Sequence, residues 1–479
     1  MNPSVVALSV IFGITATGSL AAFFAGSRYR MDLEQWTVAG RGFGIVLVWM
    51  LMAGEVYTTF AFLGASGWAY SKGGPSLYII AYLILAYVVS FYILPNVWVV
   101  GRRYGMQTEP DFFHKRYGSM FISAFVALVG VVFLIPYLQL QLTGLGLIVN
   151  VASFEGVDRS TAMVIGTALV TGFVFVSGVR AVAWVSVFKD FLMLFAAIFL
   201  GIGIPYTHFG GIGPMFKALA RANPAHLLMP GATKSMGHAW FVSTVILTSL
   251  GFHMWPHLFG ATFTAKNGNI LRRNAAIMPL YCITLPFIFI VGFACIRIVP
   301  GLGNGDLSLL TVVRNTYPAW FLGVIGGAGA ITAMVPAAIL TLTTATLFTK
   351  NFFRPVFLPG MSDDKVAGMA KILVIVISVV TLYFAVFSST TLVNLLLLGY
   401  SGVTQFFPGV VYGLYWRRVT GAGVFIGMAF GVATAAFLIL KEMDPFLGLN
   451  AGFIALCVNF AATTIISFMT EAAPNPFEN

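Results

Sequence analysis

Thirteen stretches of roughly 20 apolar residues recur along the sequence, and this is the length that an α-helix needs to cross a bilayer. They begin near residues 4, 43, 77, 119, 160, 182, 237, 275, 318, 367, 392, 420 and 449. Only 9% of the 479 residues are charged, against about a quarter in soluble proteins. The pattern predicts an all-α integral membrane protein with 13 transmembrane helices in one domain spanning residues 1–479, and it excludes a soluble enzyme.

The basic residues between the runs predict an orientation, because cytoplasmic loops carry an excess of Lys and Arg. With the N-terminus outside, seventeen of the 26 Lys and Arg residues fall on the inner side and eight on the outer side. No positive residue or targeting extension precedes the first run, which is therefore expected to be a retained helix. We expect a multi-pass protein of a prokaryotic cytoplasmic membrane, with the N-terminus outside and the C-terminus inside.

The remaining composition excludes two other classes of protein. The net charge of +11 is spread singly and in pairs between the apolar runs, whereas nucleic-acid binding needs a basic patch or tail. The three cysteines, Cys282, Cys295 and Cys457, lie inside apolar runs and form neither a disulfide framework nor a spaced metal cluster. The expected partners are the lipid bilayer and a small molecule, and a monomer is compatible with this.

Three charged residues lie inside the predicted spans, namely Glu55 in the second run and Lys189 and Asp190 in the sixth. A charge at membrane depth costs at least a few kcal/mol, so such residues mark a functional site by default. The alternative is an ion pair that only locks two helices together.

Two of the spans carry an interruption near their middle. Gly54 and the polar residues after Glu55 weaken the second run, and Pro256 removes a backbone donor from the seventh. Broken helices in corresponding places point to an inverted-repeat transporter with its site at the midplane. The two repeats are predicted at about residues 43–206 and 237–415.

The histidines at positions 253 and 257 offer a competing interpretation. His253 and His257 are four residues apart on one helical face, a spacing that suits a metal ion. However, no Asp, Glu or Cys lies nearby in the sequence to complete the ligands. We therefore expect no metal site, no cofactor and no catalytic residues, and the histidines are assigned to packing or to a solute contact.

Five groups of residues form motifs that are specific in combination. They are Gly40-Arg41-Gly42, Pro136-Tyr137 with Gln141 and Gly144, Gly178-Val179-Arg180-Ala181-Val182-Ala183-Trp184, Trp255-Pro256-His257 with Thr264-Ala265-Lys266-Asn267, and Gln405-Phe406-Phe407-Pro408-Gly409 with Gly413-Leu414-Tyr415-Trp416-Arg417-Arg418. Together they resemble the sodium:solute symporter family over nearly the whole chain. The resemblance implies a LeuT-type 5+5 inverted-repeat core with one extra helix before it and two after it. It also implies alternating access, with solute and coupling ion bound near the two breaks.

Within the family, one branch is most similar. The stretch from Glu55 to Phe60 and that from Phe62 to Tyr70 resemble the monocarboxylate permeases. That resemblance implies lactate, pyruvate, acetate, propionate or a similar short acid as the solute. The alternative is a sodium-coupled symporter of proline, pantothenate or a sugar. A channel or a membrane-embedded enzyme is a distant alternative, because no continuous polar stripe or catalytic constellation is evident.

The family's sodium site is formed by two carbonyls of the second helix and by three positions of the ninth. The resemblance places these carbonyls at Gly54 and Tyr57, and it places the three positions at Thr332, Val335 and Pro336. The paired hydroxyl groups of the family are therefore missing in this register. A shift of two turns would instead bring in Thr341, Thr343 or Thr344.

The sixth helix also departs from the family pattern. Val185-Ser186 replaces the usual Thr-Asp, and Lys189 appears one turn deeper. In proton-coupled relatives of this fold a lysine on the corresponding helix takes the place of the sodium ion. Because burial disfavours a charged amine, we expect Lys189 to bind and release a proton. When charged it is expected to lie against the carbonyls of Gly54 and Tyr57, and Glu55 or Asp190 is expected to adjust its proton affinity. A proton is thus favoured over sodium as the coupling ion. The alternative is that the Lys189 side chain extends to the inner surface and only pairs with a lipid phosphate.

A monocarboxylate needs hydrogen-bond donors and an apolar wall. Backbone amides of the half-helices and several side chains offer donors, while Trp255 and Phe60 are expected to limit the length of the solute. Each residue also has an ordinary role in packing. The residues assigned to solute binding are Val56, Tyr57, Thr58, Phe60, Gln139, Gln141, His253, Trp255, His257 and Gln405.

Overall fold

Helices make up all the regular structure that the computed structural model describes, which covers residues 2–26, 33–176, 179–472 and 474–478. Ten of the described helical segments are long and apolar enough to cross a membrane, and Ile45–Gly54 and Arg159–Val174 are shorter apolar helices. The predicted all-helical class is confirmed. Arg28, Arg30 and Gly178, on which part of the sequence argument rests, lie outside the described residues.

The helices of the first half follow one another in the order expected from the apolar runs. They are α1 (Pro3–Gly26), α2 (Leu33–Val38), α3 (Ile45–Gly54), α4 (Ala65–Ser71), α5 (Tyr78–Arg103), α6 (Glu109–Tyr117), α7 (Met120–Ala152), α8 (Arg159–Val176), α9 (Val179–Phe209) and α10 (Ile212–Ala222). The π-helical turn η2 (Phe60–Gly64) directly precedes α4, and the short amphipathic helix α10 lies in the long connection between α9 and α11.

The helices of the second half complete the fold. They are α11 (His238–Gly251), α12 (Pro256–Thr262), α13 (Gly268–Cys282), α14 (Leu285–Ile298), α15 (Ser308–Thr316), α16 (Ala319–Thr346), α17 (Arg354–Phe357), α18 (Asp363–Phe387), α19 (Leu392–Val403), α20 (Phe407–Tyr415), α21 (Gly421–Leu440) and α22 (Ala451–Met469). Short turns connect some of them, namely η5 (Phe252–Met254), η6 (Gly305–Leu307), η7 (Leu347–Phe353) and η8 (Thr404–Phe406).

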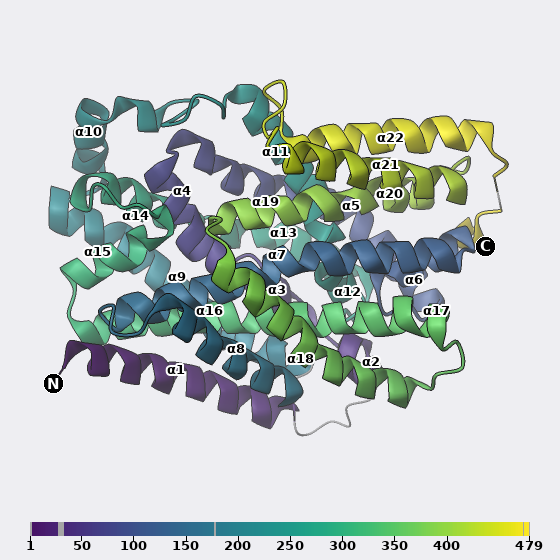
Figure 1. Ribbon diagram of the computed structural model, residues 1–479, viewed down its shortest axis with the longest axis horizontal. Coiled ribbons are helices and arrows are strands. Elements are labelled where there is room, and N and C mark those ends of the chain that lie inside the picture. Colours follow the sequence, from purple (N-terminus) through teal and green to yellow (C-terminus); the bar gives the residue numbers. More distant parts are fainter. Residues whose placement is uncertain (1, 27–32, 177–178, 473, 479) are drawn as a thin grey trace.

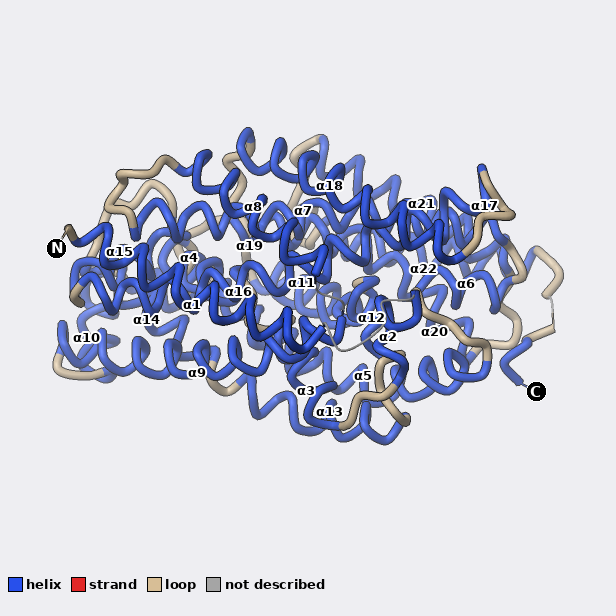
Figure 2. Tube along the Cα trace, turned by 90° about the horizontal axis from the view of Figure 1, so that it is seen from below, coloured by secondary structure: helices blue, strands red, loops and turns tan. Residues whose placement is uncertain are grey.

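The two chain ends lie at opposite ends of the long axis of the molecule (Figures 1 and 2). We call them the N-terminal end, which carries α10, α14 and α15, and the C-terminal end, which carries α6 and α17. Figure 1 places α1 along one flank of the bundle and the α21–α22 pair along the opposite flank.

Small residues allow the flanking helices to approach closely, as is usual in membrane bundles. A Cβ on Gly323 of α16 would lie 2.7 Å from Val10 Cβ of α1. On α21, Gly423, Gly427 and Gly431 repeat every four residues and face α22, where a Cβ on Gly427 would lie 2.0 Å from Thr463 Oγ1. Larger side chains at these positions would separate the helices.

The first predicted interruption divides the second apolar run into α3 and α4. Helix α3 ends at Gly54, and residues 55–58 form a turn in which the amide of Val56 bonds to Ala53 O at 2.9 Å. The chain then continues through η2 into α4. The carbonyl oxygens of Gly54 and Tyr57 accept hydrogen bonds from a side chain of another helix instead of completing the helical pattern.

The second predicted interruption divides the seventh run into α11 and α12. Proline disfavours the helical conformation of the residue before it, and Trp255 is indeed extended, with ψ 124°. Pro256 then opens α12, where its missing N–H costs no helical hydrogen bond. Because both breaks shorten their helices, neither run is among the ten long spans.

A short bridge joins the two broken segments near the C-terminal end. Phe43, just before α3, donates its amide to Thr264 O at 3.0 Å, and its carbonyl accepts from the amide of Lys266 at 3.0 Å. These bonds pair Phe43 with Ala265, beyond the end of α12, in a parallel arrangement. The first half of the second run, α3, is therefore joined to the second half of the seventh run, α12.

Candidate functional site

Lys189 of α9 is fully buried, with 0% of its surface exposed, and it faces the break after α3. Its ammonium donates hydrogen bonds to the carbonyl oxygens of Gly54 and Tyr57, the latter at 2.9 Å. The contact expected from the sequence is therefore present. The side chain does not reach the molecular surface, as contact with a lipid phosphate would require.

Gly54 makes this approach sterically feasible. A Cβ at this position would lie 2.9 Å from Ser186 Oγ and 3.3 Å from Lys189 Nζ. The first distance is shorter than real Cβ contacts, so a side chain here would push α3 away from α9. The residue that ends α3 thus also leaves room for the ammonium.

Asp190 follows Lys189 in the chain and is also buried. Its Oδ1 lies 3.5 Å from Lys189 Nζ, an ion pair removed from water. On the other side of the break, the Tyr57 hydroxyl contacts Thr284 Oγ1 between α13 and α14, and its ring meets Tyr281 edge-on at 5.1 Å. The ammonium is thus surrounded by two carbonyls and a carboxylate.

The third side of the expected coupling site lies on α16, which packs against α9. Thr332, Val335 and Pro336 are all buried. Thr332 Oγ1 has no hydrogen-bond partner among the described residues. By contrast, Thr341 and Thr344, from the alternative register, donate to carbonyls of their own helix at 2.7 Å. No hydrogen bond joins Lys189 to the described residues of α16.

A second buried charged contact lies between the two breaks. His257 Nε2, in the first turn of α12, lies 3.1 Å from Glu55 Oε2, directly after α3. Glu55 is 5% and His257 2% exposed. The other ring nitrogen of His257, Nδ1, has no hydrogen-bond partner in the described part of the chain. Sequence reasoning named both residues but did not pair them.

A narrow cavity of about 30 Å³ reaches His257 from the C-terminal end of the molecule. This volume holds about two water molecules. Polar residues near its mouth, Gln107 and Thr108, precede α6, and Gly260 and Thr346 contribute from α12 and α16. Water therefore has room to approach the Glu55–His257 pair from that end.

The polar residues expected to bind solute are only partly engaged. Thr59 Oγ1 donates to Gln141 Oε1 at 2.7 Å, and Gln141 Nε2 has no partner among the described residues. Thr58 Oγ1 accepts from the amide of Phe60 at 3.3 Å. Gln139 of α7 is buried, as are Val56 and Phe60, two further residues expected to bind solute.

Aromatic rings surround the break in the seventh run. The indole of Trp255 lies 4.8 Å from the ring of Tyr137 and 5.3 Å from that of Tyr400. His253 packs against Tyr87 at 5.6 Å, whereas His257 faces Glu55. Because the break lies between them, the two histidines point to different neighbours, and no group of three metal-ligating residues occurs among the described residues.

Gln405 occupies a different environment. Its amide nitrogen donates to Ser401 O at 3.0 Å, and Asn459 of α22 donates to its side-chain oxygen at 3.1 Å. These contacts hold Gln405 of η8 to α19 and α22 and do not include residues of either break. Its assignment to solute binding gains no support from this position.

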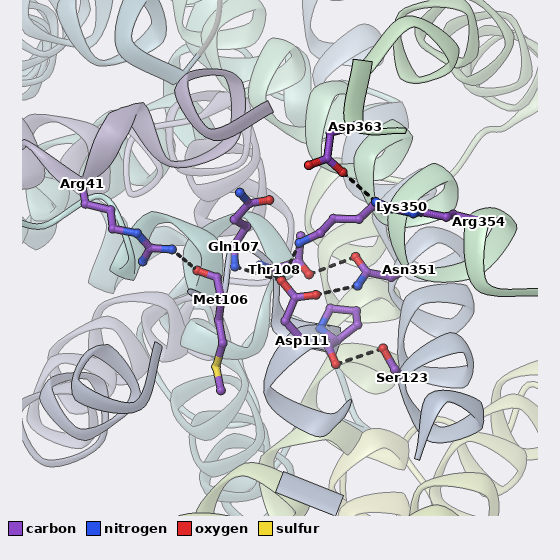
Figure 3. Close-up of polar contacts among 11 residues, drawn as sticks. Arg41, Met106, Gln107, Thr108, Asp111, Ser123, Lys350, Asn351, Arg354 and Asp363 are labelled. Carbon is purple, nitrogen blue, oxygen red and sulfur yellow. Dashed lines mark hydrogen bonds and ion pairs between the residues drawn. The ribbon is translucent and has the colours of Figure 1, made fainter. Parts of the chain in front are cut away.

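A polar cluster at the C-terminal end was not anticipated (Figure 3). Asp111 of α6 accepts from Lys350 Nζ at 2.6 Å and from Asn351 Nδ2 at 2.8 Å, both from η7. The amides of Gln107 and Thr108 bond to the same carboxylate at 2.9 and 3.0 Å. Because Gln107 and Thr108 also line the cavity, the cluster holds the cavity mouth in place.

A sequence signal for part of this cluster was available. Thr108 and Asp111 form a capping box at the start of α6, a pattern readable from the sequence. Burial opposes ionisation of Asp111, but the Lys350 ammonium and the hydrogen bonds from Gln107 and Asn351 hold the pKa of its carboxyl below the ordinary value. The partner on η7, over 200 residues away, has no local signal.

At the N-terminal end, Asp306 of η6 caps the start of α19. Its Oδ2 accepts from the amide of Leu392 at 3.0 Å. A Cβ on Gly67 of α4 would lie 2.7 Å from its Oδ1, so η6 packs directly on α4. Burial raises the pKa of Asp306 to about 6, against the opposing effects of the Leu392 amide and Arg159.

The sequence is similar to known proteins over most of its length. The family model described as "Sodium:solute symporter family" matches residues 36–431. The uncharacterized symporter YhjB of Bacillus subtilis (strain 168) is 44% identical over 98% of each chain. The monocarboxylate transport permease protein of Rhizobium johnstonii is 27% identical, again over 98% of each chain.

A solved structure shares the fold of the chain. It is the substrate-bound, outward-open state of a Na⁺-coupled sialic acid symporter, with a TM-score of 0.81, 17% sequence identity and coverage of 98% of both chains. At this identity the likeness shows the arrangement of the helices alone. It agrees with the expected LeuT-type architecture, in which broken helices cross near the midplane.

Proposed function

We propose a specific transport activity for this chain, which belongs to the sodium:solute symporter family: proton-coupled symport of small monocarboxylates by alternating access. The chain is a multi-pass membrane transporter of the secondary active kind and not an enzyme. The proton, the class of solute and the orientation in the membrane are our inferences from the site and from the charge pattern.

The buried ammonium of Lys189 carries the choice of a proton. It donates hydrogen bonds to the Gly54 and Tyr57 carbonyls and places there the positive charge that a bound sodium ion would supply by coordination. Burial favours the neutral amine over the ammonium. Lys189 can therefore release its proton, and the positive charge at the carbonyls is then lost. Loss of the proton frees the carbonyls and weakens the contact between α3 and α9, so that the two helices separate.

Thirteen membrane crossings are consistent with this proposal. The ten long spans, α8 and the broken pairs α3–α4 and α11–α12 make thirteen segments. An odd number of crossings also suits the positions of the two chain ends (Figure 1). We assign the N-terminal end to the outside, because the C-terminal end then receives the excess of Lys and Arg, and we place the protein in the cytoplasmic membrane.

We assign the binding of a short carboxylic acid to the region of the two breaks. Thr58, the unpartnered amide of Gln141 and His257 are buried there and could supply donors. The rings of Trp255 and Tyr137 form an apolar wall that favours a solute with a short tail. The similarity to a relative named as a monocarboxylate permease also supports this class of solute. The binding site is contained within one chain, so a monomer is sufficient.

Sodium-coupled symport of another small solute is the second candidate. The unpartnered hydroxyl of Thr332 favours it, since a buried oxygen without a donor is a natural cation ligand. In that case Lys189 would fasten α3 to α9 permanently and take no part in coupling.

Uptake into proteoliposomes distinguishes the two candidates. Labelled pyruvate or acetate is supplied under an inward proton gradient, an inward sodium gradient, or neither. We expect accumulation with the proton gradient only, and its loss in Lys189→Ala, while the exposed Lys365→Ala control accumulates solute normally. Accumulation that follows sodium and ignores pH would refute proton coupling, and a preference for proline or a sugar would refute the class of solute.

A further inference from the structure

The Glu55–His257 contact is separate from the hydrogen bonds of Lys189. Lys189 joins α9 to the break after α3, whereas His257 joins that same break to α12. Glu55 and His257 thus lie between the two half-helices on which a solute is expected to bind. The family resemblance gives no reason for a carboxylate there, since a carboxylate repels an anionic solute.

The charges around Glu55 limit what can bind beside it. Lys189 and Asp190 from α9 interact electrostatically with Glu55, as do the phenols of Tyr87 from α5 and Tyr137 from α7. His257 approaches from α12. One ammonium therefore already faces two carboxylates, and a buried third carboxylate would be left without a compensating charge.

Entry of a proton removes this conflict. With the solute bound, three carboxylates would share a buried site with one ammonium, and their mutual repulsion favours uptake of a proton by one of them. The water-sized cavity lined by His257 lets protons pass between this site and the C-terminal end, which we assign to the inside, and protons released after transport would use it. The unpartnered Nδ1 of His257 leaves one ring nitrogen available to that water.

We propose that Glu55 and His257 form a partner-exchange site, in which the carboxylate of the solute replaces Glu55 at His257 Nε2 while Glu55 takes up a proton. Before exchange, the Glu55 carboxylate accepts the hydrogen bond from Nε2–H. After exchange, the solute carboxylate accepts that bond and Glu55 is a neutral carboxylic acid. One anion and one proton have entered, so the net charge of the site is unchanged.

This inference rests on the proposed class of solute but not on the role of Lys189. It makes one proton enter with each solute at the binding step itself, before any movement of the helices. The affinity for pyruvate should therefore fall about tenfold for each unit of rising pH where Glu55 is ionised in the empty protein. Replacing Glu55 by the neutral amide Gln mimics the protonated state and should make binding independent of pH.

Binding in detergent, without any gradient, tests the proposal. Sodium pyruvate is added to the purified full chain in weakly buffered solution, and bound pyruvate and proton uptake are measured together by calorimetry and a pH indicator. We expect about one proton per bound pyruvate in the wild type and none in Glu55→Gln. The exposed Glu471→Gln control should match the wild type, and His257→Gln should weaken binding at least tenfold.

The remaining outcomes each decide the question. Proton uptake that persists in Glu55→Gln and disappears in Lys189→Ala would assign the proton to Lys189 and overturn the exchange. If Glu55→Gln does not fold, Glu55→Asp is used in its place. The exchange would be overturned if both Glu55→Asp and the wild type bind pyruvate independently of pH and without proton uptake. Failure of the wild type to bind pyruvate or acetate at any pH would refute the proposed class of solute and, with it, this inference.

Discussion

A methyl group on Gly54 tests the contact between α3 and α9 without replacing a charged residue. In Gly54→Ala the new Cβ would lie 2.9 Å from Ser186 Oγ and 3.3 Å from Lys189 Nζ. Ser186 Oγ is held by its hydrogen bond to Val182 O, at 2.9 Å. Relief of the clash therefore moves α3 away from α9 or turns the Ser186 side chain, and in both cases the ammonium loses its place.

The expected size of this effect follows from known overpacking. Extra carbon in a well-packed interior costs about 1–3 kcal/mol. If this cost falls on the state in which Lys189 contacts Gly54, the population of that state drops about 5- to 150-fold relative to states in which the helices are apart. Proton-driven accumulation of pyruvate should decrease by at least the lower figure, and the melting temperature should fall.

Two variants provide the comparison for Gly54→Ala. Gly44, at the start of the same helix, has a φ of −75°, and a Cβ added to it would have no heavy atom within 4 Å. Gly44→Ala should therefore change stability by about 0.5 kcal/mol or less. The double variant with Ser186→Gly returns the missing space and should transport better than Gly54→Ala alone. Equal behaviour of Gly54→Ala and Gly44→Ala in uptake and melting would refute the reasoning.

Three further predictions concern other parts of the molecule. Asp111→Asn should lower stability at pH 7 by on the order of 3 kcal/mol, because Lys350 loses its carboxylate partner. The pKa of Asp111 is held low in the folded state, so its charge stabilises the fold at neutral pH and stops doing so once the carboxylate is protonated. The difference in melting temperature between wild type and variant should therefore close as the pH falls below about 4. The pKa of Asp306, raised to about 6, has the opposite sign: the folded state gains stability as the pH falls through 6, so the melting temperature of Asp306→Asn should fall further below that of wild type between pH 7 and 5. Trp255→Phe should improve competition by butyrate against labelled pyruvate by about tenfold, because a removed ring volume admits an extra methylene.

Each of these predictions has a contradicting result. A difference in melting temperature between wild type and Asp111→Asn that stays constant from pH 7 to pH 3 would show that the charge of Asp111 contributes nothing to stability. Parallel melting curves for the wild type and Asp306→Asn across pH 7 to 5 would show that this carboxyl does not titrate there. If butyrate competes against labelled pyruvate equally well in wild type and Trp255→Phe, the indole of Trp255 does not limit the length of the solute.

The breaks could be predicted from the sequence because their causes are local. Gly54 and Pro256 act on their own helices through backbone freedom and a missing donor, and both effects are visible in a short window. The contact of Lys189 with Gly54 and Tyr57 was also anticipated, but only because the family resemblance supplied the pairing of helices. Its role in coupling remains a prediction.

The contacts between distant segments could not be predicted in this way. Glu55 and His257 are 202 positions apart, and Asp111 and Lys350 are 239 apart. Neither pair leaves a periodic signal, because the residues meet only after the helices pack. Gln405 illustrates the reverse case, since a motif match suggested a solute contact while packing against Asn459 gives it another partner.

The bridge at Phe43 has a mechanical consequence. Its two backbone hydrogen bonds tie the start of α3 to the chain that follows α12, and Glu55 holds the other end of α3 to His257. Both contacts are buried, and as long as Glu55 stays bound to His257 they hold α3 and α12 together at two points. Loss of the proton from Lys189 in that state should therefore release α3 and α12 from α9 as one unit.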